Sequence, residues 1–140
     1  MSRPFRLTLQ QALLDAMIQQ AQAELPNECC GLLAGTVSEG HAVVLERYPL
    51  VNALASPREY SGESRGLLQA HKAMRASNSE LLAIYHSHPT SAPIPSKTDL
   101  ERNYSPDVMH FIISLVGEEP EVKAWWLDEQ SYELAKWSIG

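Results

Sequence analysis

The amino-acid sequence predicts one domain of mixed α/β or α+β class, and three observations support this. Segments with the apolar spacing of α-helices alternate with apolar runs that are typical of β-strands. The predicted order is helix, two strands, helix, strand, loop and then a run of strands. A length of 140 residues is enough for one hydrophobic core and too short for two comfortable ones. We therefore expect a single domain over residues 1–140.

The first half of the chain is predicted to contain two helices and two strands. Thr8, with a glutamine three residues later, forms a capping-box pattern, so the first helix should begin after Thr8 and end before Pro26. Apolar residues then recur at helical spacing up to Leu25. Three further elements are predicted in this half: strands over Cys29–Val37 and His41–Leu50, joined by a turn at "SEG", and a helix over Ser64–Ala76.

The second half is predicted to consist mainly of strands. Glu80–His88 ("ELLAIYHSH") is apolar enough to be buried on both faces for most of its length. Val108–Gly117 is predicted to be a similar strand. The segments "EVKAWWLD" and "SYELAKWS" should form a closing hairpin around "EQ", with the two adjacent tryptophans divided between core and surface.

Charge and targeting signals narrow the possible partners. The formal net charge is −6, and no cluster of basic residues occurs along the chain. Because binding to phosphates needs concentrated Lys and Arg, we expect no nucleic-acid partner. The N-terminal segment "MSRPFRLTLQ" lacks the apolar core of a signal peptide, and no apolar run has the length of a membrane span. We therefore expect a cytoplasmic protein that does not associate with membranes.

The two cysteines, Cys29 and Cys30, are adjacent. Neighbouring side chains on an extended chain point to opposite faces, so we expect no disulfide between them. The absence of a CxxC pair disfavours a zinc finger or a thioredoxin-like site. We interpret both cysteines as small apolar core residues, because nothing in the sequence supplies a base for a thiolate nucleophile.

The end of the predicted strand Glu80–His88 has the residue types of a metal site. His86 and His88 project from the same face of a strand, and imidazole is a favoured zinc ligand. Asp99 follows in the next loop, far enough along the chain for its carboxylate to come back towards them. Such a set leaves one tetrahedral position open, which distinguishes a catalytic zinc site from a structural one.

A simpler interpretation of the same residues is also open at this point. An HxH pair occurs in ordinary solvated loops, and Ser96 with Asp99 fits an S-x-x-D cap that would open a short helix at Lys97. Spacing excludes other zinc sites: there is no HExxH helix, no HxE with a later PCxxC and no HxHxDH motif. A barrel-type amidohydrolase would need roughly 250 residues.

Three segments together resemble one family, the JAMM (MPN+) zinc metalloproteases. "PNECCGLLAG" resembles the glutamate-bearing segment of the family, and "NALASP" resembles its middle segment. The similarity covers roughly 7–127 and is closest to the small stand-alone prokaryotic type. The family signature H-x-H-P-x6-S-x2-D is reproduced without a departure by His86, His88, Pro89, Ser96 and Asp99.

The resemblance implies a fold and a role for each matching residue. The fold would be the α+β, cytidine-deaminase-like MPN/JAB fold, in which helices flank a mixed, curved sheet. His86, His88 and Asp99 would hold one zinc ion per chain, with water as the fourth ligand. Glu28 would act as general base and then pass its proton to the leaving amine. Ser96 would stabilise the oxyanion of the tetrahedral intermediate.

The resemblance also implies a substrate class. Family members cleave ubiquitin or ubiquitin-like β-grasp proteins after a C-terminal Gly-Gly tail, and short prokaryotic relatives act on sulfur carriers of the ThiS and MoaD type. We therefore expect a zinc-dependent (iso)peptidase for such carriers, with a sheet edge that could support a homodimer. A non-catalytic MPN-type scaffold and a RadC-like DNA-associated protein are the alternatives. The complete ligand set disfavours the first, and the acidic charge and "ECCGLLAG" disfavour the second.

Overall fold

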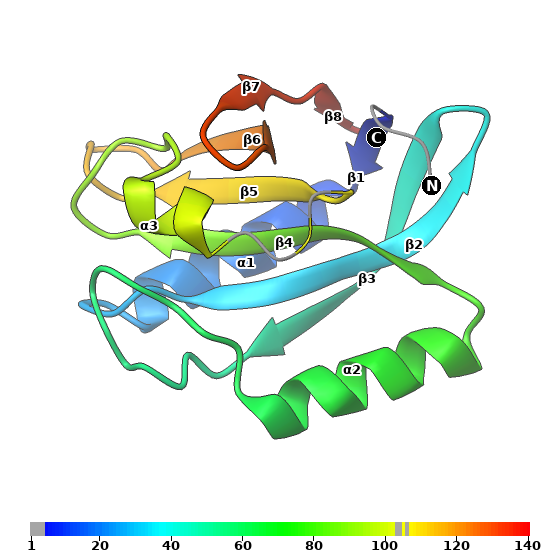
Figure 1. The fold of residues 1–140 in the computed structure, drawn as a ribbon, viewed down its shortest axis with the longest axis horizontal. Helices are drawn as coiled ribbons and strands as arrows, with labels where there is room; N and C mark the ends of the chain where they lie inside the picture. The colour runs from blue at the N-terminus through cyan, green and yellow to red at the C-terminus, as the bar shows by residue number, and fades with distance from the viewer. Residues whose placement is uncertain (1–4, 103–104, 106) are drawn as a thin grey trace.

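A computed structural model describes residues 5–102, 105 and 107–140, and Figure 1 shows its fold. Within these residues, eight strands form one mixed sheet and three helices pack around it. The elements in chain order are β1 (Arg6–Leu9), α1 (Gln11–Ala23), β2 (Cys30–Ser38), β3 (His41–Leu50), α2 (Ser64–Ala76), β4 (Glu80–His88), α3 (Lys97–Glu101), β5 (Met109–Ser114), β6 (Glu121–Leu127), β7 (Tyr132–Leu134) and β8 (Trp137–Ile139).

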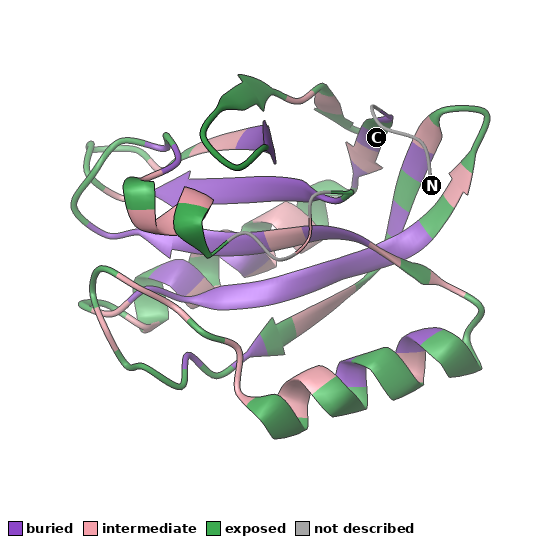
Figure 2. Cartoon of the chain, in the orientation of Figure 1, coloured by how far each residue is buried: buried purple, intermediate pink, exposed green. Residues whose placement is uncertain are grey.

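The strands lie in the order β7-β6-β5-β4-β2-β3-β1-β8. β4 pairs with β5 in parallel and with β2 in antiparallel orientation, so it lies well inside the sheet. β1 pairs in parallel with both β3 and β8, and the remaining pairs are antiparallel. The predicted mixed sheet is therefore confirmed, with β4 among its central strands. Figure 2 shows that β4 and β5 are buried over most of their length.

The sheet curves until its two edges meet. β7 and β8 lie at opposite ends of the strand order, yet only Ala135 and Lys136 separate them along the chain. The Ala135 N–H donates to the Ala124 carbonyl of β6, and the Lys136 carbonyl accepts from the Leu7 N–H of β1. Because the three Cα–Cα steps from Leu134 to Trp137 span at most about 11 Å, both edges must come close together, as β7 and β8 do in Figure 1. The predicted curved sheet is confirmed.

The two faces of the sheet carry separate apolar clusters. α1 buries Met17 and Ala21 on one face, and α2 buries Ala70 and Met74 on the other (Figure 1). In both helices the buried pair is spaced by four residues, which places both side chains on the same face of the helix. Each helix has 13 residues, whereas a membrane-spanning helix needs about 20. Within the described part of the chain, no helix is long and apolar enough to cross a membrane.

Cys29 and Cys30 lie on opposite faces, as expected from the alternation of an extended chain. Cys29 packs in the cluster beneath α1, and Cys30 packs in the cluster beneath α2. Both are buried and free. Burial raises the pKa of the Cys29 thiol to about 11 and that of Cys30 to about 12. The prediction that they are core residues without a disulfide is confirmed.

Three expectations about local structure are wrong. Thr8 lies in β1, where its Oγ1 is 2.6 Å from His41 Nε2, while α1 begins after Gln10 without a side-chain cap. Pairing of β1 with two strands outweighs the local capping pattern. The first part of "SYELAKWS" forms the predicted hairpin, because β7 pairs with β6, but its second part is β8, which pairs with β1. Trp125 and Trp126 are both buried, at 7% and 2% exposure, because β6 is covered on both faces.

Candidate metal centre and active site

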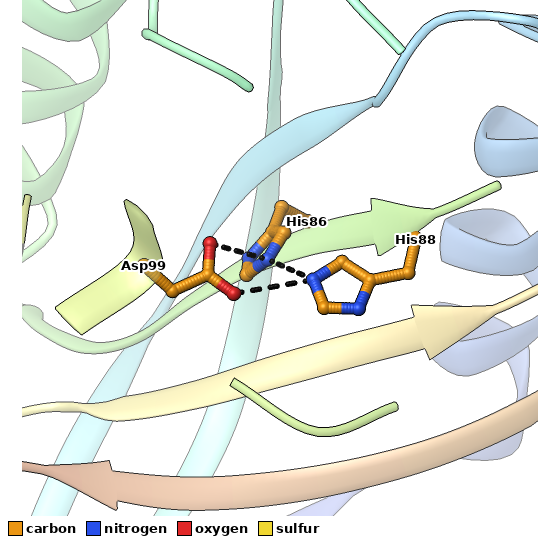
Figure 3. A group of neighbouring side chains, drawn as sticks. All are labelled: His86, His88 and Asp99. Carbon is orange, nitrogen blue, oxygen red and sulfur yellow. Dashed lines mark hydrogen bonds and ion pairs between the residues drawn. The ribbon is translucent and has the colours of Figure 1, made fainter. Parts of the chain in front are cut away.

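β4 brings two imidazoles to one point at its C-terminal end. His86 and His88 are two residues apart on the strand and only 1% and 4% exposed. Their Nε2 atoms are 3.1 Å apart. His86 lies opposite Cys30 of β2 and next to Ile112 of β5, so neighbouring strands fix its backbone on both sides. Figure 3 shows both rings directed towards Asp99.

Asp99 reaches the two histidines because it caps α3. The Asp99 N–H donates to Ser96 Oγ at 3.0 Å, and the Ser96 N–H donates to Asp99 Oδ2 at 2.9 Å. The capping box considered as the simpler interpretation therefore forms, and the helix begins at Lys97 as that pattern predicts. The same carboxylate faces both imidazoles, so Asp99 both completes the capping box and occupies the position of the predicted ligand.

The trio is compact enough to share one metal ion, with a different oxygen of Asp99 nearest to each imidazole. Asp99 Oδ1 lies 3.2 Å from His86 Nε2, and Oδ2 lies 3.1 Å from His88 Nε2. Two ligand atoms bound at 2.0–2.1 Å from one tetrahedral ion are about 3.3 Å apart. Within the described residues, this trio is the group of metal-binding side chains whose ligand atoms converge within 4.8 Å.

The hydrogen bonds of the trio also favour a cation. His88 Nδ1 is 2.8 Å from the Ala92 carbonyl, which can only accept, so Nδ1 carries the proton. In a neutral imidazole, the Nε2 lone pair then faces a carboxylate and a second imidazole. Lone pairs directed at one another repel unless a proton or a metal ion lies between them. The residues therefore fit a divalent ion, with Ala92 holding His88 in the tautomer that a metal requires.

Electrostatics keep the Asp99 carboxylate charged. Burial raises its pKa, but the charge of His86 and hydrogen bonds from His86, His88 and the Ser96 N–H lower it further, so the net pKa is well below the usual range. Burial lowers the pKa of His88, while its hydrogen bonds with Asp99 and Ala92 raise it by more. The site therefore presents a carboxylate at neutral pH.

Side chains from three strands hold the loop between β4 and α3. Three consecutive carbonyls of this loop each bond a side chain from a strand. Ser91 accepts from Ser114 Oγ at 2.6 Å, Ala92 pairs with His88 Nδ1, and Pro93 accepts from Trp125 Nε1 at 2.9 Å. Its prolines suit this role, because a segment held through its carbonyls has no need of N–H donors. The loop therefore carries Ser96 and Asp99 on a fixed support.

Glu28 lies two residues before the start of β2 and is 3% exposed. Its Oε1 is buried and has no hydrogen-bond partner among the described residues. Burial raises the pKa of Glu28 to about 8, with the charge of His88 lowering it and that of Asp99 raising it. Cys30 pairs with His86 in antiparallel orientation, and Cys29 bonds Ser87 through its N–H and its carbonyl, so Glu28 lies next to His88. An unpaired buried carboxyl beside a metal site is what a general base needs.

The backbone around Glu28 is fixed by three hydrogen bonds. The Glu28 N–H donates to the Ser56 carbonyl at 2.8 Å, and the Glu28 carbonyl accepts from Asn52 Nδ2 at 3.0 Å. The next N–H, of Cys29, donates to Ser87 Oγ at 2.8 Å. Ser87 lies between the two histidines, so β4 positions the ligands and Glu28 together.

Asn52 also organises the loop before α2. Its Nδ2 donates to the Glu59 carbonyl at 2.9 Å, and its Oδ1 accepts the N–H groups of Leu54 and Ser61, each at 3.1 Å. Together with its bond to Glu28, Asn52 thus makes four hydrogen bonds, which is its full capacity. Tyr60 of this loop stacks on the His86 ring, with centroids 4.5 Å apart and planes at 19°. Asn52 therefore links Glu28 to the residue that covers a predicted ligand.

Comparison with known proteins places this arrangement in a family. Residues 10–128 match the family described as prokaryotic homologues of the JAB domain. The chain belongs to this family. The resemblance drawn from the sequence is thereby confirmed, together with the α+β fold that it implies.

Relatives of this prokaryotic JAB protein include named peptidases. It is 32% identical to the desampylase of Haloferax volcanii over 135 residues, which cover 93% of this chain and 94% of the relative. It is 33% identical to the CysO-cysteine peptidase of Mycobacterium tuberculosis over 108 residues, 77% of this chain and 73% of the relative. A probable TtuB-protein conjugate cleaving protease of Thermus thermophilus is 36% identical over 96 residues, 68% and 62% of the two chains.

Solved structures agree with the prokaryotic JAB assignment. A protein from Desulfitobacterium hafniense, solved in solution, has a TM-score of 0.86 at 30% identity and covers 98% of this chain and 93% of its own. A protein from Salinibacter ruber has a TM-score of 0.70 at 25% identity, covering 97% and 92%.

The sequence predicted that His86, His88 and Asp99 converge, and they do so in the structure. It did not predict the residues that support this JAB site. Ser87 lies between the two histidines of the motif, and Asn52 begins "NALASP". Both therefore belong to segments that resemble the family, but the sequence alone indicates no role for either of them. Tyr60 and Trp125 carry no local signal. Tyr60 acts through a stack on His86, and Trp125 acts through a hydrogen bond to a backbone atom 32 residues away.

Proposed function

We propose that this prokaryotic JAB protein is a zinc-dependent (iso)peptidase. It would cleave after the C-terminal Gly-Gly tail of a ubiquitin-like or sulfur-carrier protein. The observation that carries the proposal is the convergence of two imidazoles and a carboxylate beside a buried carboxyl group with an unpartnered oxygen. That combination supplies a cation site and a proton acceptor in one place, which are the two requirements of metal-assisted hydrolysis.

Each residue would have a separate part in the reaction. His86, His88 and Asp99 would hold the zinc ion, which when bound lowers the pKa of water towards about 7 and polarises the substrate carbonyl. Glu28 would take the proton of the attacking water and give it to the leaving amine. A positive charge at the trio would lower the pKa of Glu28 from about 8 and so favour its basic form.

Ser96 would stabilise the developing oxyanion. Its Oγ accepts the Asp99 N–H, so the hydroxyl hydrogen remains available for a further acceptor. Ser96 is half-buried, and α3 holds it next to Asp99. A preorganised donor aimed at charge that appears only in the transition state lowers the barrier rather than strengthening substrate binding.

The substrate class is supported by the relatives. The desampylase, the CysO-cysteine peptidase and the TtuB-protein conjugate cleaving protease are each named for cleavage of a conjugate or a carrier. The desampylase aligns with nearly the whole of both chains. A tail that ends in two glycines suits a narrow, buried centre because it carries no side chains and adopts conformations that other residues do not.

The test compares zinc-loaded wild type with Glu28→Gln on β-grasp carriers that bear a reporter after Gly-Gly. Both proteins should hold one zinc per chain by mass spectrometry. The wild type should release the carrier with an intact Gly-Gly end, and Glu28→Gln should be slower by about 10²–10⁴-fold, the usual contribution of a general base. Glu129→Gln, at an exposed position, is the matched control and should behave as wild type.

Two results would overturn the proposal. Zinc-loaded wild type that leaves every carrier of a broad panel intact would remove the substrate class. Equal rates for wild type and Glu28→Gln would remove Glu28 as base. The single domain, the cytoplasmic location, the absence of a nucleic-acid partner and a homodimer through the edge strands β7 or β8 stay predictions.

A further inference from the structure

A pocket of about 430 Å³ lies on the face of the sheet that carries the predicted ligands. We call it the α2 pocket. Leu32 of β2 and Ile84 of β4 form its floor, and Leu67 of α2 and Tyr60 of the preceding loop form one wall. Residues of α3, Asp99 among them, form the opposite wall. Its volume lies within the range of about 300–1,000 Å³ that is usual for ligand sites.

The α2 pocket is continuous with the candidate metal centre. Asp99 lines the pocket and also faces both imidazoles. Tyr60 lines the pocket and stacks on the ring of His86. A substrate chain that reaches the metal centre from this side therefore passes along the pocket.

The wall nearest α2 is apolar and partly open. Leu67, Ile84 and Tyr60 are half-buried and pack on the apolar cluster that includes Leu32 and Leu50. An apolar side chain placed here would cover their remaining exposed surface, which is favourable. A charged side chain would lose water against the same wall, which holds no charged partner; the charged residues that line the pocket, Asp99 and Arg102, lie on its α3 side. The wall therefore selects an apolar group.

The position of Ile84 indicates which residue of the tail would reach the pocket. Ile84 precedes His86 by two residues on the same face of β4, a separation of about 6.6 Å. An extended substrate advances about 3.3–3.6 Å per residue, so this separation corresponds to two residues. A tail that runs along β4, with the carbonyl of its last glycine at the metal centre, would place the residues just before Gly-Gly over Ile84 and the α2 pocket.

We propose that the α2 pocket is a specificity subsite of the peptidase. It takes an apolar side chain from one of the two residues that precede the Gly-Gly of the carrier tail. This inference rests on the proposed function. It makes the tail sequence before Gly-Gly, as well as the glycines, a determinant of which carrier is cleaved.

Two neighbouring leucines of α2 provide a matched pair of variants. Leu67 lines the pocket, whereas Leu68 is 58% exposed and does not line it. Leu67→Trp would fill the pocket, and Leu68→Trp is the control of equal size. Leu67→Ala, which enlarges the pocket, provides a second variant should the tryptophan impair folding. None of these residues belongs to the ligand set or the predicted base.

The substrates are carriers that differ only in having Leu, Phe, Ala or Asp at each of the two positions before Gly-Gly. At one of these positions, the kcat/KM of the wild type should be higher for Leu than for Asp by at least about tenfold, in the range that an apolar pocket provides. Leu67→Trp should lose the preference for Leu over Ala, and Leu67→Ala should accept Phe better than wild type does. Leu68→Trp should keep the wild-type order.

A binding measurement separates this inference from the proposed function. Tail peptides with the same substitutions are titrated into Glu28→Gln by fluorescence anisotropy. Tighter binding of the Leu peptide, weakened by Leu67→Trp, would support the pocket even if no carrier is cleaved. Cleavage rates that do not depend on the residues before Gly-Gly, or that fall equally for all tails in Leu67→Trp, would overturn the assignment of the pocket as a subsite. The proposed peptidase activity would be unaffected by that result. Selectivity that follows the residue after the cleaved bond would assign the pocket to the leaving group and also overturn the inference.

Discussion

Hydrogen bonds hold the side chains of two predicted metal ligands, His88 and Asp99, whereas at Glu28 they hold only the backbone. Asp99 Oδ2 accepts the Ser96 N–H, and His88 Nδ1 bonds the Ala92 carbonyl. The third ligand, His86, has no hydrogen-bond partner at Nδ1 among the described residues, and its ring is held by the stack on Tyr60. The bonds at Glu28 reach only its N–H and its carbonyl, and Oε1 has no partner in the described part of the chain. The comparison indicates that the ligand set is assembled in advance and that the carboxyl of Glu28 is left free to react.

The same contrast appears in the pKa values of the two acids. Asp99 and Glu28 are both buried, and burial raises the pKa of each. The imidazoles and an N–H donor outweigh burial at Asp99, whereas nothing comparable does so at Glu28. Two neighbouring acids whose environments move their pKa values apart are typical of a site in which one group binds and the other transfers protons.

Removal of a metal ligand should have the largest effect, because it disrupts the group of side chains that is assembled in advance. Asp99→Asn keeps the shape and can still cap α3, but it removes the charge between His86 and His88. We expect the zinc Kd to rise more than 100-fold, beyond the 10–100-fold typical of losing a residue that only orients a ligand. Competition with a chromophoric chelator measures this change. Asp107→Asn, at an exposed position, should leave the Kd unchanged.

Ser96→Ala should lower turnover without removing the metal. The variant loses the hydroxyl donor but keeps the Ser96 main-chain N–H that bonds Asp99 Oδ2. We expect kcat to fall about 10²–10³-fold, as for loss of one oxyanion donor, with zinc content near one per chain. Ser96→Thr, which retains a hydroxyl, should recover part of the rate. A parallel loss of zinc would instead assign Ser96 to the ligand support alone.

Trp125→Phe should weaken metal binding moderately. It removes the N–H that bonds the Pro93 carbonyl, and Ala92, next to it, fixes the tautomer of His88. We expect a rise in zinc Kd of about tenfold, the lower end for loss of an indirect support. Trp126→Phe is the matched control, because Trp126 packs in the other core and should affect thermal stability alone. Equal Kd values for the two variants would show that the loop does not depend on this tether.

A pH dependence of stability, rather than of metal binding or turnover, is expected in the zinc-free protein. Folding raises the pKa of Glu28 from 4.5 to about 8. The stability that this group contributes is therefore fully present below pH 4.5 and is lost as the pH rises towards 8. The difference in free energy of unfolding between wild type and Glu28→Gln, from urea titrations, should shift against wild type over that range. A difference that is constant with pH would place Glu28 in contact with solvent.

Much of the fold could be predicted because its signals are local. The bounds of α2, β3 and β4 agree with the predicted segments, since each has a strong apolar period and a clear end. β1 was missed because four residues carry little periodicity and gain their partners from β3 and from β8, at the far end of the chain. Only the folded chain supplies those partners.

The candidate site likewise contains residues that could be predicted from the sequence and residues that could not. The trio was predictable because its three residues lie within one motif and their chemistry requires a common centre. Asn52 and Ser87 were not, because each bonds a backbone atom remote in sequence, Glu28 O at 24 residues and Cys29 N at 58. A backbone partner leaves no residue type to recognise, so these supports appear only with the structure.

X-ray absorption at the zinc edge of the loaded protein tests the central claim most directly. The account predicts one zinc per chain with nitrogen and oxygen neighbours at about 2.0–2.1 Å, an imidazole signature for two histidines and no sulfur. Loss of one oxygen neighbour in Asp99→Asn should accompany the fall in affinity. A sulfur neighbour near 2.3 Å would place the ion on Cys29 or Cys30 instead. That result, or a protein that binds no zinc, would contradict the account.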